Sequence, residues 1–143
     1  MSIWRGQPLL ESINNYRKNT LIEHLNILIT EVGDDFLVGT MPVDSTTIQP
    51  HGLLHGGASC VLAETLGSIA ANLTLDPAKK YAVGLEINAN HIRSEKSGLV
   101  LGKAAPLHRG RSTQIWEIKI TNQQNKLVCI SRLTLAIKDR PSL

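Results

Sequence analysis

Aromatic side chains and cysteines are scarce in this chain. Aromatic residues make up 3% of the 143 residues, and the two cysteines are Cys60 and Cys129. So few aromatics predict a largely aliphatic core, and they leave little material for stacking on nucleobases. The cysteines are far apart in the sequence and do not have the spacing of metal ligands. We therefore expect two reduced thiols, as in a cytosolic protein.

The sequence also lacks dense runs of Lys and Arg and long uncharged hydrophobic runs. The formal net charge is +3 and the pI is about 9.0. This balance suits a phosphate-rich small ligand better than a nucleic acid, which requires a basic stripe. The first ten residues do not have the apolar core of a signal peptide, and no segment is apolar enough to span a bilayer. We expect a cytoplasmic protein with no metal, no nucleic-acid partner and no membrane partner.

The hydrophobic fraction of 42% is typical of a globular protein. We expect one domain over residues 1–143, which is long enough for a substantial core. The expected helices are 9–18 and 56–75, and the expected strands are 25–31, 36–43, 83–90, 99–107, 112–121 and 127–137. Strands on both sides of one long helix predict an α+β fold in which an antiparallel sheet wraps around that helix.

The long expected helix carries one formal charge, Glu64, in the stretch from Gly52 to Leu75. A carboxylate among small and apolar residues is costly to bury unless it has a use. The helix begins at Gly56 and Gly57, where free backbone N–H groups can stabilise a developing negative charge. A helix start of this kind, followed by a lone carboxylate, is typical of an acyl-transfer site.

The two faces of this helix differ in side-chain size. One face should bury against the sheet, and its residues are Ala58, Leu62, Leu66, Ile69 and Leu73. The opposite face is made of Gly57, Cys60, Glu64, Gly67, Ser68 and Ala71. Solvent-exposed helix faces usually carry several Lys and Glu residues. We therefore expect this second face to pack against another surface, as at a subunit interface.

Gly56 and Glu64 of a single helix cannot act on one scissile carbonyl group. Eight helical residues separate them by about 12 Å, whereas both groups must reach neighbouring substrate atoms. Two antiparallel helices related by a twofold axis would bring Gly56 of one subunit near Glu64 of the other. We therefore expect a dimer with two shared sites.

Four segments resemble the hotdog-fold acyl-CoA thioesterases: MPVDS at 41–45, QP-x-GLLHGGAS at 49–59, LAE-x-x-GS at 62–68 and VGLEINANHIRS at 83–94. The resemblance covers nearly the whole chain. It is nearest to the bacterial branch that hydrolyses 1,4-dihydroxy-2-naphthoyl-CoA in menaquinone synthesis, a branch related to the 4-hydroxybenzoyl-CoA thioesterases. It implies a hotdog fold, a double-hotdog dimer, a homotetramer of two such dimers, and an acyl-CoA substrate with no separate cofactor. One departure is His51, which stands where relatives commonly have Phe, in the acyl pocket.

The resemblance also implies roles for individual residues. Glu64 matches the catalytic nucleophile or general base, and Gly56 matches the oxyanion donor. His55 and Gln49 match residues that orient the thioester or the water, and Ser68 matches a hydroxyl that positions the water or the carboxylate. The positions that match coenzyme A contacts are Gly84, Asn90, His91, Ile92, Arg93, His108, Arg109, Gly110, Arg111, Ser112 and Thr113.

Several alternatives remain open at this point. A hotdog dehydratase or hydratase acting on 3-hydroxyacyl thioesters also sets a His against a helix carboxylate, and some hotdog domains only sense acyl-CoA. His55 could simply cap or pack the helix. Its i, i+4 spacing from His51 is a weak metal pattern with no evident third ligand. The basic residues near the coenzyme A positions could form an ordinary solvated surface.

Overall fold

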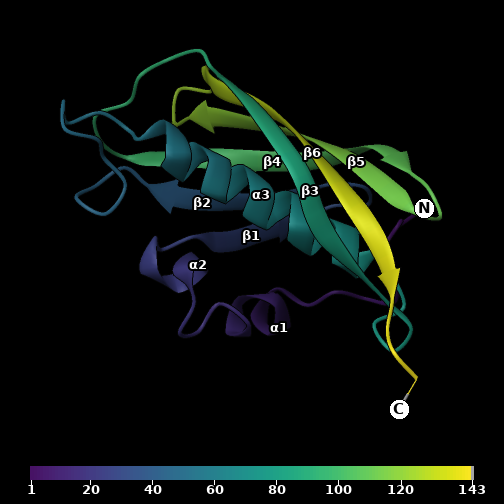
Figure 1. The fold of residues 1–143 in the computed structure, drawn as a ribbon. Helices are drawn as coiled ribbons and strands as arrows, with labels where there is room; N and C mark the ends of the chain where they lie inside the picture. Colours follow the sequence, from purple (N-terminus) through teal and green to yellow (C-terminus); the bar gives the residue numbers. More distant parts are fainter. Residues whose placement is uncertain (143) are drawn as a thin grey trace.

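One long helix lies in the curve of a six-stranded antiparallel sheet in the computed structural model, which describes residues 1–142 (Figure 1). The elements are α1 (Leu10–Asn15), α2 (Leu21–His24), β1 (Leu28–Val32), β2 (Leu37–Pro42), α3 (Gly56–Leu73), β3 (Lys80–His91), β4 (Leu99–Arg109), β5 (Thr113–Asn122) and β6 (Leu127–Asp139). The strand order is β1-β2-β4-β5-β6-β3. The predicted α+β hotdog fold is confirmed, and the short α2 is the element that the sequence did not predict. No helix in residues 1–142 combines the length and apolar character needed to cross a membrane.

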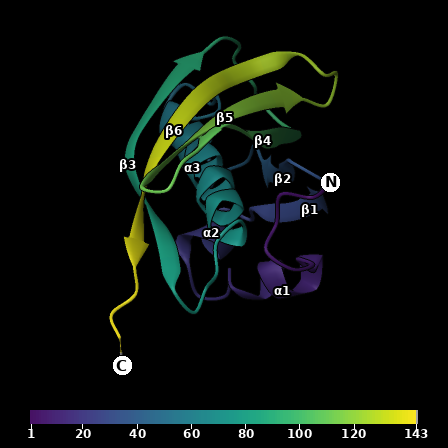
Figure 2. The same cartoon turned by 90° about the vertical axis from the view of Figure 1, so that its right-hand side faces the viewer.

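The concave side of the sheet holds α3, whereas α1 and α2 lie beside β1 at the open side (Figure 2). Leu62 and Leu66 of α3 are fully buried against the sheet. The core is mostly aliphatic, as predicted. Its aromatic part is a stacked pair, Trp4 and Trp116, with 6.3 Å between the ring centroids.

Two glycines allow α3 to approach the sheet closely. Gly39 of β2 and Gly102 of β4 are opposite each other in the ladder. A Cβ atom on Gly39 would lie 2.7 Å from Leu66 Cδ2, and one on Gly102 would lie 2.5 Å from Leu66 Cδ1. Leu66 therefore occupies space that side chains on these two strands would otherwise fill, and this contact fixes the distance between α3 and the sheet.

The predicted small-residue face of α3 is only partly free. Gly67 and Ala71 are buried within the same chain, and a Cβ atom on Gly67 would lie 2.6 Å from Leu133 Cδ2 of β6. The prediction that these two residues lie at a subunit interface is wrong, because the curved sheet covers more of the helix than one apolar stripe. The members of this face that stay partly or fully exposed are Gly57, Cys60, Glu64 and Ser68.

The edge strand β3 crosses α3 and carries a bulge (Figure 1). Its register against β6 shifts between Gly84 and Glu86. Leu85, at the bulge, is 62% exposed, whereas Ile87 packs against the core. Apolar residues occupy every second position from 83 to 89 in the sequence, but because of the bulge these positions do not all lie on one face of the strand. Gly84 faces α3 before the bulge, and Ile87 faces it after the bulge.

We predict that Gly102 and Leu66 are energetically coupled. Gly102→Val should lower the free energy of unfolding by about 1–3 kcal/mol through overpacking, and Leu66→Ala should lower it by about 2–5 kcal/mol through the cavity it creates. In the double variant the valine side chain enters the space that Leu66 vacates, so the combined loss should be smaller than the sum. Urea unfolding of the four proteins measures this coupling, and additive losses would contradict it.

Candidate active site

The helix α3 begins at a turn that leaves a backbone donor available. His55 is the N-cap residue, and its Nδ1 accepts a 2.8 Å hydrogen bond from the N–H of Gly57. The capping role left open for His55 is thus confirmed, and its Nε2 is the ring atom that remains for a ligand. Over residues 1–142, the N–H of Gly56 makes no hydrogen bond. A free donor at a helix start is the type of group that binds an anion.

A cleft of about 330 Å³ opens beside this helix start. The predicted site residues that line it are Gln49, Gly56, His91, Ile92 and Arg93. The His91 ring lies against Gly56, since a Cβ atom on Gly56 would be 2.8 Å from His91 Nε2. The structure therefore joins the helix start to the predicted coenzyme A positions at the end of β3. Asn90 is exposed on β3 and does not line this cleft.

Gln49 is held in a tight turn before α3. Its N–H donates to the carbonyl of Leu53 and its carbonyl accepts from the N–H of Gly52, both at 2.8 Å. Gly52 has a φ of 78°, a conformation that favours glycine. The side-chain oxygen of Gln49 accepts a hydrogen bond from the N–H of His51, whose own side chain is exposed. The turn thus fixes the Gln49 side chain at the wall of the cleft.

Glu64 lies near the middle of α3, beneath β3, and is half-buried. A Cβ atom on Gly84 would overlap Glu64 Oε1. The missing side chain at position 84 therefore makes the space that the carboxylate occupies. Glu64 takes part in none of the three ion pairs found among residues 1–142. An unpaired, half-buried carboxylate can act as a nucleophile or a general base.

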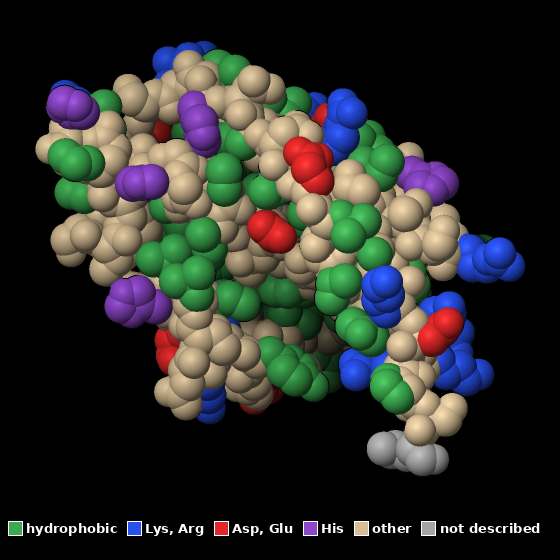
Figure 3. Space-filling model, viewed as in Figure 1, with side chains coloured by type: hydrophobic (Ala, Val, Ile, Leu, Met, Phe, Trp, Pro, Cys, Tyr) green, Lys and Arg blue, Asp and Glu red, His purple; other side chains and the backbone are tan. Residues whose placement is uncertain are grey.

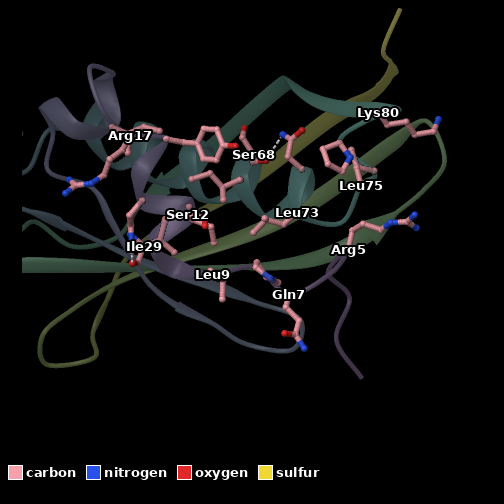
Figure 4. A pocket seen from close by; sticks show the side chains of 18 of the residues that line it. Arg5, Gln7, Leu9, Ser12, Arg17, Ile29, Ser68, Leu73, Leu75 and Lys80 are labelled. Carbon is pink, nitrogen blue, oxygen red and sulfur yellow. Dashed lines mark hydrogen bonds between the residues drawn. The ribbon is translucent and has the colours of Figure 1, made fainter. Parts of the chain in front are cut away.

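Ser68 follows Glu64 by one helical turn and lines a larger groove of about 610 Å³ (Figure 4). This groove lies between α1 and the C-terminal half of α3, and apolar side chains such as Leu73 line much of it. Arg5 and Lys80 are among its basic residues. Figure 3 shows a hollow on this face, with hydrophobic side chains inside it and Lys and Arg side chains gathered to one side. We call this feature the α1–α3 groove.

The remaining predicted coenzyme A contacts lie in the β4–β5 turn and in the strand ends beside it, at the other end of the sheet (Figure 1). They are His108, Arg109, Gly110, Arg111, Ser112 and Thr113. Thr113 pairs with Ala136 of β6, whereas His91 pairs with Cys129 of the same strand. These positions on β6 are about 23 Å apart at 3.3 Å per residue. A single chain therefore does not bring the β4–β5 turn to the cleft.

A family model described as the thioesterase superfamily matches residues 51–129, more than half of the chain. The chain belongs to the thioesterase superfamily. It is 50% identical to the 1,4-dihydroxy-2-naphthoyl-CoA hydrolase of Escherichia coli over 135 residues, which are 94% of this chain and 98% of that protein. The same identity, aligned length and coverages hold for the proofreading thioesterase EntH of Cronobacter sakazakii.

A solved structure gives the same result for the fold. The crystal structure of a Haemophilus influenzae thioesterase matches this chain with a TM-score of 0.93 and 47% sequence identity, over 96% of this chain and 95% of that one. The predicted resemblance to hotdog thioesterases is therefore confirmed. The chain is an enzyme that acts on thioesters.

Neither cysteine of this thioesterase has the environment of a nucleophile. Both thiols are free, and Cys129 is buried. Burial raises the pKa of the Cys60 thiol, and the nearby Glu64 carboxylate raises it further. Burial also raises the pKa of the Cys129 thiol. Both groups are therefore protonated at neutral pH, and a protonated thiol is a poor nucleophile.

Sequence reasoning missed the α1–α3 groove. Its walls come from segments that are distant in the sequence, including α1, α3 and Arg140 after β6. Their side chains meet only when the chain folds, so no local motif predicts the groove. The one sequence signal for the groove was the position of Ile69 and Leu73. Both are apolar residues at the end of the predicted buried face of α3, and both line the groove.

We predict that Gly84→Ala lowers the kcat of this thioesterase by about 10- to 100-fold with little change in KM. The new methyl group would displace the Glu64 carboxylate, and a misplacement of about 1 Å can cost a factor of 10² in rate. Val83→Ala is the matched control, because Val83 is the neighbouring residue on β3 and faces away from α3. Steady-state kinetics with one acyl-CoA substrate compares the three proteins. An unchanged kcat in Gly84→Ala would rule out this use of the glycine.

Proposed function

We propose that this thioesterase hydrolyses an aromatic acyl-CoA, such as 1,4-dihydroxy-2-naphthoyl-CoA, to the free acid and coenzyme A. The observation that carries the proposal is Glu64, a half-buried carboxylate in a space kept open by Gly84. Family membership favours hydrolysis over the dehydratase and acyl-CoA-sensing alternatives. A thioester has a good leaving group, so a carboxylate and an oxyanion-binding donor are sufficient chemistry.

Two routes use the same pair of groups. In the general-base route, Glu64 takes a proton from water while the water oxygen bonds to the thioester carbon. The N–H of Gly56 stabilises the resulting oxyanion. The C–S bond then breaks, and the coenzyme A thiolate takes the proton from Glu64. In the nucleophilic route, the carboxylate itself attacks the carbon, the thiolate leaves, and water hydrolyses the mixed anhydride. Gln49, His55 and Ser68 orient the thioester or the water in either route.

The proposed site contains groups from two subunits. Gly56 and Glu64 of one α3 are about 12 Å apart along the helix axis, which is too far for one thioester carbonyl. The edge strand β3 supports a dimer, because it has 12 residues and, in the chain as described, β6 as its one neighbour in the sheet. Antiparallel pairing of two β3 strands about a twofold axis would set two α3 helices side by side in opposite directions.

The same twofold axis accounts for the separated coenzyme A positions. It reverses one subunit relative to the other, so the β4–β5 turn of one subunit comes to the end of the sheet where the other has its cleft. Arg93 in the cleft, with Arg109 and Arg111 from the turn, could then bind the phosphates of one coenzyme A. Of these, Arg93 lines the cleft in the chain as described.

We place the acyl group of the substrate in the α1–α3 groove. Ser68 links the two regions, since it follows Glu64 by one turn and lines the groove. The volume of about 610 Å³ is in the range of pockets that bind drug-sized molecules, and it is ample for two fused aromatic rings. In this proposal the enzyme works in the cytoplasm, in menaquinone synthesis, as a tetramer of two dimers. The names of the relatives leave other acyl groups open, because two proteins of equal identity to this chain are named differently.

We predict that the wild-type protein releases free thiol from naphthoyl-CoA and benzoyl-CoA faster than from acetyl-CoA. Glu64→Gln should lower kcat by about 10²- to 10⁴-fold, the usual contribution of a general base, and should keep substrate binding. A thiol reagent measures hydrolysis and distinguishes it from hydration, which releases no thiol. Equal rates on all three substrates would contradict the aromatic preference, and full turnover by Glu64→Gln would contradict the role of the carboxylate.

We also predict that two inactive variants restore activity when they are mixed as dimers. Gly56→Pro removes the oxyanion donor, and proline is well tolerated at the first position of a helix. Co-refolded Glu64→Gln and Gly56→Pro chains should give about one quarter of the wild-type rate. Half of the dimers would be mixed, and each of these would have one intact site of two. Gly56→Ala is the control, because it adds the same Cβ atom but keeps the N–H. A mixture as inactive as its parents would contradict the shared site.

A further inference from the structure

Each edge of the sheet is held to a helix by one asparagine side chain. On β1, Asn14 Nδ2 donates to the carbonyl of Ile29 and Asn14 Oδ1 accepts from the N–H of Ile29, both at 2.9 Å. On β3, Asn72 Oδ1 accepts from the N–H of Ala82 at 2.9 Å, and Asn72 Nδ2 donates to the carbonyl of Ala82 at 3.2 Å. We call each of these pairs of hydrogen bonds, Asn14 to Ile29 and Asn72 to Ala82, a clamp. Both clamps lie at or just before a β-bulge. The two interactions therefore have the same chemistry at opposite edges of the sheet.

The clamp on β3 closes one end of that edge. Ala82 is 7% exposed, so its backbone groups need hydrogen-bond partners. Because both of these groups bond to Asn72, they lie on the side of β3 that faces away from β6. Asn72 Nδ2 also donates to the carbonyl of Ser68 at 2.9 Å, the bond drawn beside Ser68 in Figure 4. The amide thus ties the strand to the helix turn that follows Glu64.

We infer that Asn72 is a positioning residue for Glu64, because it docks β3 on α3 two residues before Gly84. The inference rests on the proposed hydrolytic function of Glu64. In the described chain, β3 is otherwise held in the sheet by β6 alone, and its register slips just after Gly84. At Ala82 the outward backbone groups are taken by Asn72, so a second β3 strand cannot pair there, and a bulged strand can move relative to the helix below it. The clamp prevents that movement at the place where Gly84 makes room for the carboxylate.

Asn72 lines the α1–α3 groove, but in this proposal it acts on Glu64 through β3 and not by binding the acyl group. Both of its side-chain polar atoms are used by the chain itself, in bonds to Ser68 and Ala82. Its loss should therefore lower kcat, because the carboxylate is misplaced, and should leave KM nearly unchanged. The deficit should also be the same for short and long acyl groups. A residue that contacted the acyl group would instead change KM or the preference among substrates.

The test uses Asn72→Ala and Asn72→Asp in the full-length protein. Asn72→Ala removes all three hydrogen bonds, whereas Asn72→Asp keeps the acceptor for the N–H of Ala82 and loses both donors. We expect kcat to fall about tenfold or more in Asn72→Ala, and less in Asn72→Asp, with KM within about twofold of the wild-type value for benzoyl-CoA and naphthoyl-CoA. Hydrogen–deuterium exchange should become faster in the peptide covering residues 80–91.

Asn122→Ala is the matched control, because it also removes three side-chain hydrogen bonds of one asparagine, and Asn122 lines neither the cleft nor the α1–α3 groove. It should lower the melting temperature by a similar amount and leave kcat for benzoyl-CoA within about threefold of the wild-type value. An equal loss of kcat in the Asn122 and Asn72 variants would overturn the inference, and so would unchanged exchange in residues 80–91. A wild-type protein that hydrolyses no thioester would refute the proposed function instead, while exchange would still decide whether Asn72 holds β3.

Discussion

The proposed chemistry depends on the fit of Glu64 beneath Gly84. A carboxylate loses hydration when a strand crosses it, and here no ion pair within residues 1–142 compensates for that loss. The glycine leaves room for the carboxylate at the strand, and the bulge that follows turns Ile87 and His91 toward the helix. Through these two features one strand contacts the middle and the start of α3. The same element therefore shapes the surroundings of both groups that the reaction needs.

The site is divided along the length of α3. The proposed oxyanion donor lies at the first residue of the helix, the Glu64 carboxylate lies about two turns later, and the α1–α3 groove begins one turn after that. These groups are spaced along the axis of one straight helix, so those of a single copy cannot converge on one thioester carbonyl group. A second copy of α3 running in the opposite direction would bring Gly56 of one subunit near Glu64 of the other.

Much of this arrangement was predictable from the sequence, and the failures have physical causes. The glycines at the helix start and the lone charge at Glu64 identify α3, because capping and burial cost act locally, and they are the basis of the proposed chemistry. Gly67 and Ala71 were assigned to the wrong surface, because their burial depends on how far the sheet curves around the helix. The alternation in residues 83–90 gave no sign of the bulge, since a bulge is set by pairing with β6. The α1–α3 groove likewise depends on contacts between distant segments.

The paired glycines under Leu66 have a consequence for sequence variation among relatives. Gly39 and Gly102 face each other across two strands, and both leave room for the same leucine side chain. A larger residue at either position is compatible with the fold only if position 66 becomes smaller or α3 moves outward. Moving the helix away from β2 and β4 would also change the fit of Glu64 against Gly84 of β3. Positions 39, 66 and 102 should therefore covary as a triplet, and enzymes that keep the carboxylate in use should conserve their combined volume.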